Sequence, residues 1–253
     1  MTNERSTGKR VAVVQSCYIP WKGYFDLINR VDEFILYDDL QYTKRDWRNR
    51  NRIKTPNGTA WLTIPVKMKG LYHQEIRDVV VSDRKWPDRH WKTLCLNYAR
   101  APHFETTRAL FHDLYKECGE ETHLSRINFR FLRALTGSLG IDTRITWSMD
   151  YGPAVEGRTE RLVHLCSKAG ATEYLSGPAA RAYLDESLFQ KQGIRVRWMD
   201  YRGYPEYDQL FSPPFIHEVS ILDLILNEGP EGAKACMLSF PSASRARRGD
   251  ALP

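Results

Sequence analysis

Two short apolar segments near the start of the chain, joined by a loop and a helix-like stretch, limit its fold more than any other feature. Arg10–Gln15 holds a continuous run of valine and alanine, which is typical of a parallel strand buried on both faces. A loop with Pro20 and Gly23 follows, and Tyr24–Val31 then has apolar residues at helical spacing. Glu33–Tyr37 is predicted as a second strand. This order is a βαβ unit, so we expect a parallel sheet.

The rest of the chain predicts a β-hairpin, a helical insertion and a second α/β portion. The Asn57-Gly58 pair between Arg48–Ile53 and Ala60–Val66 is a strong hairpin signal. Further strands are expected at 76–82, 143–147, 173–176 and 194–201, and helices at 85–98, 105–117, 124–139, 157–168, 178–192 and 219–226. The predicted class is α/β, with a mainly parallel, Rossmann-like sheet in a single domain over residues 10–230. The helical insertion covers about residues 85–140, and 1–9 and 240–253 are expected to be flexible tails.

The composition is that of a globular protein in a reducing compartment. Apolar residues make up 42 % and charged residues 27 % of the chain, and no apolar run is long enough to span a bilayer. The five cysteines form no CxxC pair and no signal peptide precedes the first strand, so we expect reduced thiols in the cytoplasm. The net charge of +6 favours anionic partners without choosing among phosphates, carboxylates and nucleic acids.

The segment 44–54 is strongly basic. It holds six cations, namely Lys44, Arg45, Arg48, Arg50, Arg52 and Lys54. On a strand, the three arginines would share one face, and Asn49 and Asn51 would lie on the other. Arginine forks match phosphate and carboxylate oxygens, so this face is a candidate anion-binding surface. The alternative is a solvated strand face, or arginines paired with Asp38 and Asp39.

The loop after the first strand, Gln15–Phe25, is the second candidate. Ligands of open α/β sheets bind at the carboxyl ends of strands, where this loop begins. Gly23 would let a ligand approach the next helix N-terminus, where free amides favour anions. Cys17 is the candidate nucleophile and His217 the best candidate base among scattered histidines. No spacing of His, Cys and carboxylate residues resembles a metal site.

These segments resemble the WbqC-like family, often encoded in O-antigen or secondary-metabolite clusters. The matching motifs follow the family's order over most of the chain: Gln15–Phe25, Gln41–Asn51, Trp61–Val66, Tyr174–Gly177 and Ser220–Leu224. The chain departs from the family's pattern at Cys17, where Asn or Thr is usual, and at His217, where proline is common. Those departures reduce the weight of a thiol mechanism and of His217 as an essential base.

The resemblance implies an acyl or aminoacyl transferase, such as a glycyl transferase, which forms an amide on an amino sugar or a secondary-metabolite intermediate. Asp38 and Asp39 follow the second strand and are candidate bases, while Gln15, Cys17 and His217 complete the catalytic candidates. The candidate substrate-binding residues are Tyr18, Trp21, Tyr24, Gln41, Trp47, Arg48, Asn49, Arg50 and Asn51. Glutamine and asparagine amides would serve as oxyanion donors, and arginines would hold a phosphate of the substrate or of a carrier.

A weaker likeness concerns the fold alone. The first βαβ unit looks like the start of adenylyl-transferring enzymes such as pantothenate synthetase, which place His-x-Gly-His in this loop. Here the corresponding residues are Trp21-Lys22-Gly23-Tyr24, so both histidines are missing. The likeness extends to the adenylyltransferase-like fold and does not support adenylate chemistry.

Two other functions stay open at this point. One is a Cys17-dependent hydrolase or transferase, and the other is a non-catalytic binding module for a phosphorylated ligand. No cofactor is expected, although ATP or a phosphopantetheine thioester on an acyl carrier protein would serve as a substrate. The expected partners are a small-molecule amine and a carrier protein; no membrane contact is expected, standard nucleic-acid motifs do not appear, and the oligomeric state is open.

Overall fold

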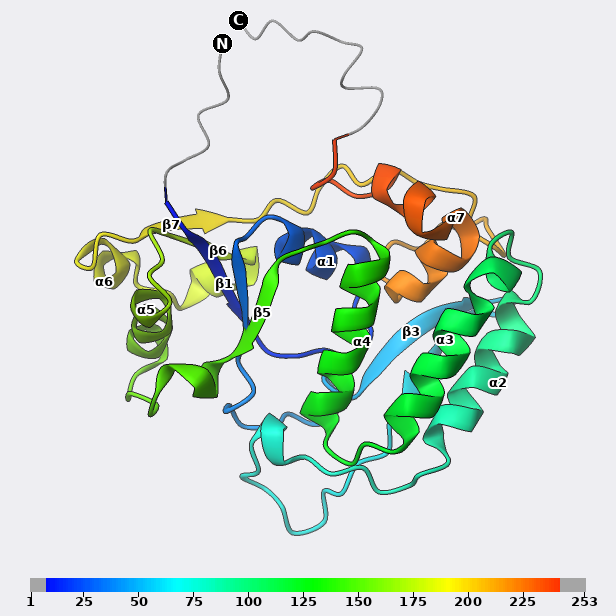
Figure 1. Ribbon diagram of the computed structural model, residues 1–253, viewed down its shortest axis with the longest axis horizontal. Helices are drawn as coiled ribbons and strands as arrows, with labels where there is room; N and C mark the ends of the chain where they lie inside the picture. Colours follow the sequence, from blue (N-terminus) through cyan, green and yellow to red (C-terminus); the bar gives the residue numbers. More distant parts are fainter. Residues whose placement is uncertain (1–7, 242–253) are drawn as a thin grey trace, which may run out of the picture.

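The computed structural model describes residues 8–241, which form a five-stranded parallel sheet with helices on both faces (Figure 1). Its strands are β1 (Arg10–Val14), β2 (Glu33–Leu36), β5 (Arg144–Trp147), β6 (Glu173–Ser176) and β7 (Arg195–Trp198). All neighbouring strands are parallel, in the order β5-β2-β1-β6-β7. The predicted α/β class and the parallel sheet are confirmed.

The strand order reverses direction once, between β1 and β6. From β1 the chain moves outward through β2 to β5, then returns through helix α5 (Arg158–Lys168) to place β6 and β7 on the other side of β1. Counted along the sheet alone, this is the 3-2-1-4-5 arrangement of doubly wound nucleotide-binding folds. The carboxyl ends of β1 and β6 therefore flank the topological switch point, where such sheets form their ligand crevice.

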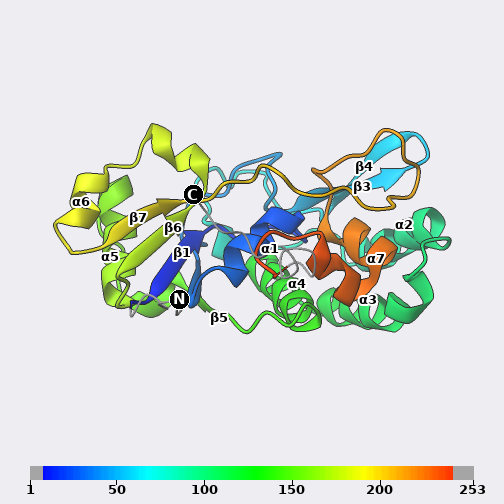
Figure 2. The ribbon, with the colours of Figure 1, turned by 90° about the horizontal axis from the view of Figure 1, so that it is seen from above.

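Alternate residues of β1 face two separate cores. Val11 and Val13 pack with α5 in the smaller core, while Ala12 faces the larger core with helix α1 (Lys22–Asn29). The central strand β1 is thus buried on both sides, as its unbroken apolar run predicted. Figure 2 shows α5 and α6 (Glu186–Gln190) at one end of an elongated molecule, beside β6 and β7.

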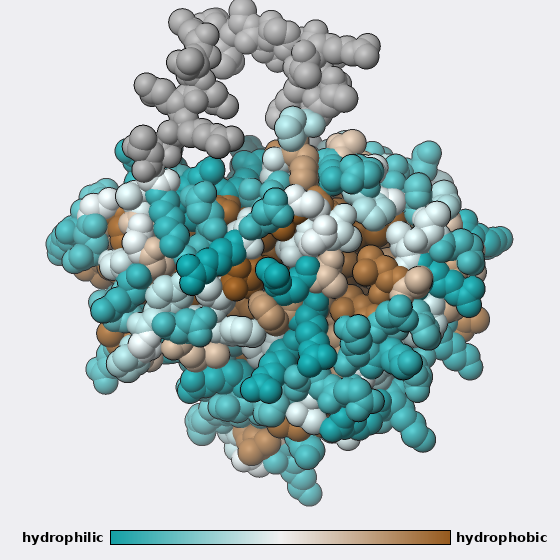
Figure 3. All heavy atoms as spheres, viewed as in Figure 1, coloured by the Kyte–Doolittle hydropathy of each residue, from teal (hydrophilic) through white to brown (hydrophobic). Residues whose placement is uncertain are grey.

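The insertion between β2 and β5 supplies the other end of the molecule. It contains the hairpin β3 (Arg50–Thr55) and β4 (Gly58–Thr63), then the helices α2 (Trp86–Tyr98), α3 (Phe104–Gly119) and α4 (Leu124–Ser138). The C-terminal helix α7 (Ile221–Ala235) packs against α3 and β3. All of these elements contribute to the larger core, and Figure 3 shows apolar side chains at the centre of a mostly hydrophilic face.

Two expectations for single elements were wrong. The expected strand at 76–82 is the 3-10 helix η1 (Ile76–Asp78) followed by isolated bridges, because Val80 and Val81 pair with single residues of different segments. The expected helix 178–192 is split into η3 (Pro178–Ala182) and α6, since Asp185 accepts a hydrogen bond from the Ser187 amide and starts a new helix.

Helix α7 is longer than expected. Its N-cap Ser220 accepts from the Leu222 amide, and the helix bends where Gly229 adopts φ 72° before Pro230. The expected flexible tails fall largely outside the described residues. No helix within residues 8–241 has the length and apolar character needed to cross a membrane.

Candidate functional site

A crevice of about 940 Å³ opens at the switch point of the sheet. The ends of β1, β2 and β6, the segment before α5, and η3 form its walls. Three of its lining residues come from the two sequence motifs, namely Gln15, Gln41 and Arg48. The structure therefore brings the first residue of one motif and two residues of the other to the same cavity, where an open parallel sheet binds ligands.

Arg48 lies at this crevice and not on the outer face of the hairpin. It precedes β3, is only 8 % exposed, and donates from Nη1 to the Ser16 carbonyl at 3.2 Å. Its Nη2 lies 3.6 Å from Asp46, and its Nε has no partner within the described residues. The expectation that Arg48, Arg50 and Arg52 share one strand face is wrong, because the strand begins only at Arg50.

The two acidic residues after β2 are both engaged by neighbours. Asp38 is fully buried, accepting from the Ser16 amide at 2.8 Å and from the Ser125 hydroxyl. Burial raises the pKa of the Asp38 carboxyl, and the bonds from Ser125 and Ser16 oppose that rise. Asp39 accepts from Ser148 and forms an ion pair with Arg161. In this arrangement both carboxylates hold the loops that build the crevice.

Cys17 is not one of the crevice-lining residues and is only 6 % exposed. Burial raises the pKa of its thiol to about 11, although the nearby Arg48 cation lowers it. A thiol with this pKa carries almost no thiolate at neutral pH, and thiolate is the nucleophilic form. Its sulfur lies 3.7 Å from the Gln15 carbonyl, and no imidazole is bonded to it. The geometry does not favour a cysteine nucleophile.

Four further motif residues make buried contacts between neighbouring segments of the chain. Asn51 donates to the Ile19 carbonyl at 2.9 Å, and Asn49 donates to the Ile64 carbonyl at 2.8 Å. The Tyr24 hydroxyl donates to the Gln15 carbonyl at 2.9 Å. Tyr18 is fully buried, and its hydroxyl contacts His90 of α2 and Tyr115 of α3. These side chains position the crevice loops and have little surface left for a substrate.

The outer face of the hairpin carries a separate aromatic and cationic cluster. The rings of Trp47 and Trp61 lie 5.4 Å apart and are 40 % and 45 % exposed. The Arg50 guanidinium lies 4.1 Å above the Trp61 ring, and Arg52 lies 5.8 Å from the same ring. Cation–π contacts thus account for the orientation of both arginines, and neither lines the crevice.

Trp21, Gly23 and His217 lie away from the crevice. A Cβ built on Gly23 would come within 2.3 Å of the Trp21 ring, so this glycine makes room for the indole and not for a ligand. The Trp21 ring packs 5.2 Å from Tyr201. His217 packs against Phe215 at 4.6 Å, and burial followed by the nearby Lys22 cation lowers the pKa of its imidazole. The structure does not bring His217 to the other candidates.

The remaining crevice residues were missed by sequence reasoning. They come from the start of α5 and the residues just before it, and from the end of β6 and the segment after it; they include Glu156, Arg158, Arg161, Ser176 and Tyr183. One signal was available in the sequence. Arg158 and Arg161 stand in the first turn of a predicted helix, where cations oppose the helix dipole. Such an arrangement favours an anion bound nearby.

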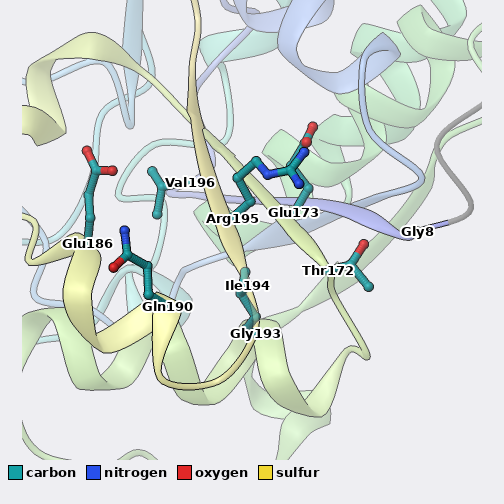
Figure 4. A pocket seen from close by; sticks show the side chains of 9 residues that line it. All are labelled: Gly8, Thr172, Glu173, Glu186, Gln190, Gly193, Ile194, Arg195 and Val196. Atoms are coloured by element: carbon teal, nitrogen blue, oxygen red, sulfur yellow. The ribbon is translucent and has the colours of Figure 1, made fainter.

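A second cavity of about 540 Å³ lies at the opposite edge of the sheet, where β6 and β7 begin (Figure 4). Glu186 and Gln190 of α6 face Arg195 and Val196 of β7 across it. It lies at the amino ends of the strands and holds carboxylates as well as an arginine. The switch-point crevice is the better candidate because it combines the strand carboxyl ends with three arginines.

Comparison with known proteins relates most of the chain to one family. The model of the WbqC-like protein family matches residues 15–235. The chain belongs to the WbqC-like family. A member described as "Uncharacterized protein Rv1507c", from Mycobacterium tuberculosis, is 53 % identical over 223 residues, which is 88 % of this chain and 95 % of that protein. No solved structure matches the chain.

The family match begins at Gln15 and includes all the crevice-lining residues except Val13 and Val14 at the end of β1. It also includes the buried residues Asn49 and Asn51, whose side chains donate to backbone carbonyls of neighbouring segments. The switch-point crevice is therefore a property of the part of the chain that the family shares. Within residues 8–241, no three His, Cys, Asp or Glu side chains come together as metal ligands would.

Proposed function

We propose that this protein is an N-acyltransferase, which passes an acyl or aminoacyl group to the amine of an amino sugar or of a secondary-metabolite intermediate. The observation that carries the proposal is the meeting of Gln15, Gln41 and Arg48 in one crevice at the switch point. These side chains supply amide and guanidinium donors at the strand ends, where a substrate carbonyl would bind. Donors of this kind stabilise the oxyanion of an acyl-transfer transition state.

The reaction is a direct aminolysis of an activated acyl group, such as a carrier-bound thioester. The amine nitrogen attacks the carbonyl carbon, the new C–N bond forms, and the C–S bond breaks. The amine loses one proton, and the leaving thiolate gains one. No enzyme nucleophile is needed, which agrees with the buried Cys17 thiol and its pKa of about 11. Positioning of both substrates then supplies most of the rate enhancement.

A carboxylate at the crevice is available to accept the amine proton. Asp38 and Asp39 are held by Ser125 and Arg161 respectively, whereas Glu156 lines the crevice and is exposed. Asp38 and Asp39 do not line the crevice, and Glu156 is the one carboxylate among its described lining residues. We assign the general-base role to Glu156 and an oxyanion-donor role to Gln15.

The test is a direct search for the amide. Acyl and aminoacyl thioesters of pantetheine are offered with amino sugars, free or nucleotide-linked, and products are measured by mass spectrometry beside thiol release. We expect amide formation that needs the amine, with kcat lowered about 100-fold in Gln15→Leu, in the range reported for loss of one oxyanion donor. Thiol release that proceeds without the amine, together with an acyl group found on Cys17, would show that the protein is a thiol-dependent hydrolase.

A further inference from the structure

Helix α5 starts at the crevice with backbone amides that have no acceptor. The amides of Arg158, Thr159 and Glu160 donate to no group within the described residues, and no side chain caps the helix. The helix has 11 residues, so its aligned peptides place partial positive charge at this end. Gly157 and Arg158 line the crevice directly. The start of α5 therefore presents unpaired donors and a positive field to the cavity.

Two arginines add to this positive field. They stand at the start of α5, where the positive end of the helix dipole disfavours cations. Arg158 and Arg161 lie one turn apart at the start of α5, and both line the crevice. Arg161 is paired with Asp39. Arg158 has no carboxylate within ion-pair distance in the described part of the chain; its guanidinium lies 4.9 Å over the Tyr183 ring. Two cations beside a helix N-terminus are stabilised when an anion binds between them.

A third arginine reaches the same crevice from a different part of the chain. Arg48 is more than nine-tenths buried, and its Nε has no hydrogen-bond partner among the described residues. A buried donor without a partner costs about 1–3 kcal/mol unless a ligand or water satisfies it. Arg48 also lines the crevice, so it adds a third positive charge to the cavity independently of the helix.

The rest of the crevice suits a flat ring. The Tyr183 side chain is 48 % exposed at the rim, and apolar residues line the adjoining wall: Val13, Leu40, Leu162, Ala179 and Ala180. The volume of about 940 Å³ lies within the usual range for small-molecule sites. A ligand that fills it would combine an aromatic ring with a strongly anionic group.

We propose that the crevice binds a nucleoside 5′-diphosphate ester. The diphosphate lies at the start of α5 among Arg158, Arg161 and Arg48, and the base stacks on Tyr183. The inference rests on the proposed function only in taking this crevice as the substrate site. Two substrates of that reaction carry the same chemistry, a nucleotide-linked amino sugar as acceptor and a coenzyme A thioester as donor.

Glu160 gives the proposal an unusual test. A Cβ built on Gly157 would come within 2.2 Å of Oε2 of Glu160, so this carboxylate folds back over the start of α5. It stands where an anion would benefit from the helix amides and therefore competes with a bound diphosphate. Neutralising it in Glu160→Gln should tighten binding about two- to fivefold, the range of one charge at a helix terminus.

The experiment is isothermal titration of the full chain at low salt with UDP, ADP, uridine, inorganic pyrophosphate, UDP-N-acetylglucosamine and coenzyme A. We expect both nucleoside diphosphates to bind, and uridine and pyrophosphate to bind at least about tenfold more weakly. Arg158→Gln and Tyr183→Ala should each weaken UDP binding by a similar factor. The matched control is Arg108→Gln, an exposed arginine of α3, which should leave binding unchanged.

Several results would overturn the inference. They are the absence of diphosphate binding to folded wild-type protein, equal binding of uridine and UDP, and equal affinity of Arg158→Gln and wild type. A tighter complex with UDP-N-acetylglucosamine would identify the acceptor as the source of the diphosphate, and a tighter complex with coenzyme A would identify the donor. Diphosphate binding without amide formation would refute only the acyltransferase proposal, and amide formation without diphosphate binding would refute only this inference.

Discussion

Acidification should destabilise this protein through one buried imidazole, His90. It is 6 % exposed on α2, where its Nε2 lies 3.1 Å from the Thr63 carbonyl and its Nδ1 lies 2.9 Å from the Tyr18 hydroxyl. A carbonyl only accepts, so Nε2–H donates to Thr63, Nδ1 accepts from Tyr18, and Tyr115 donates to the Tyr18 oxygen at 2.9 Å. Protonation of Nδ1 would require the Tyr18 hydroxyl to turn and donate to Tyr115 instead. Burial of the ring lowers the pKa of His90 from 6.5 to about 4.

The sign of the effect follows from proton binding. Between pH 4 and 6.5 the unfolded chain holds a proton on His90 and the folded chain does not, so the free energy of unfolding falls as the pH falls. Above pH 6.5 the imidazole is neutral in both states and contributes no pH dependence. With those two pKa values, the loss between pH 7.5 and pH 5 is about 2 kcal/mol, and it approaches about 3 kcal/mol below pH 4.

The assay compares urea unfolding of wild type and His90→Gln at pH 7.5 and pH 5, followed by tryptophan fluorescence. The variant lacks the titrating group, so its stability should fall by about 2 kcal/mol less than that of wild type over this interval. His112→Gln, at an exposed histidine of α3, is the matched control and should behave like wild type. An NMR titration that shows the His90 ring protonating near pH 6.5 in the folded protein would refute the reasoning, as would identical pH dependence in wild type and His90→Gln.

Three further outcomes follow from buried contacts. Cys17→Ser should keep amide-forming turnover, and native Cys17 should resist iodoacetamide at neutral pH, because burial raises the pKa of the thiol to about 11; rapid alkylation would contradict this. Tyr98→Phe should lower the free energy of unfolding by about 1–3 kcal/mol, since its hydroxyl donates to the buried Asp223 carboxylate at 2.7 Å; an unchanged urea midpoint would count against that bond. Gly229→Ala should cost about 1–3 kcal/mol because φ there is 72° and a Cβ would crowd a neighbouring imidazole, whereas Gly137→Ala, with open space around it, should be neutral or stabilising; calorimetry compares the two.

The first βαβ unit was predictable from sequence because strands buried on both faces leave an unmistakable apolar run. Arg10–Val14 and Glu33–Leu36 came out as expected, and so did the hairpin around Asn57-Gly58. The expected strand at 76–82 failed because a strand needs a neighbour of matching length, and no local pattern reveals that Val80 and Val81 meet only single residues.

The site was only partly predictable for a different reason. Sequence patterns identify the residue types that suit a ligand, but tertiary packing decides which of them are used up by other contacts. In the sequence, Asn49 and Asn51 look like side chains that bind a substrate. In the fold, their side-chain amides donate to backbone carbonyls instead. Arg158 and Tyr183 attracted no attention in sequence, and they reach the crevice only because the chain crosses back over β1 to form β6.

Asp38 is a buried carboxylate that does not line the crevice but supports a residue that does. Asp38 follows β2 and accepts from the Ser16 amide directly after β1, so it joins the ends of the two strands. The Ser16 carbonyl in turn accepts from Arg48, which does line the crevice. Removing the Asp38 side chain would free the Ser16 amide and loosen the support of Arg48, so a loss of ligand affinity in Asp38→Ala is expected from positioning alone. A direct role as base predicts instead a loss of kcat with unchanged affinity for the nucleoside diphosphate, and the two measurements separate the alternatives.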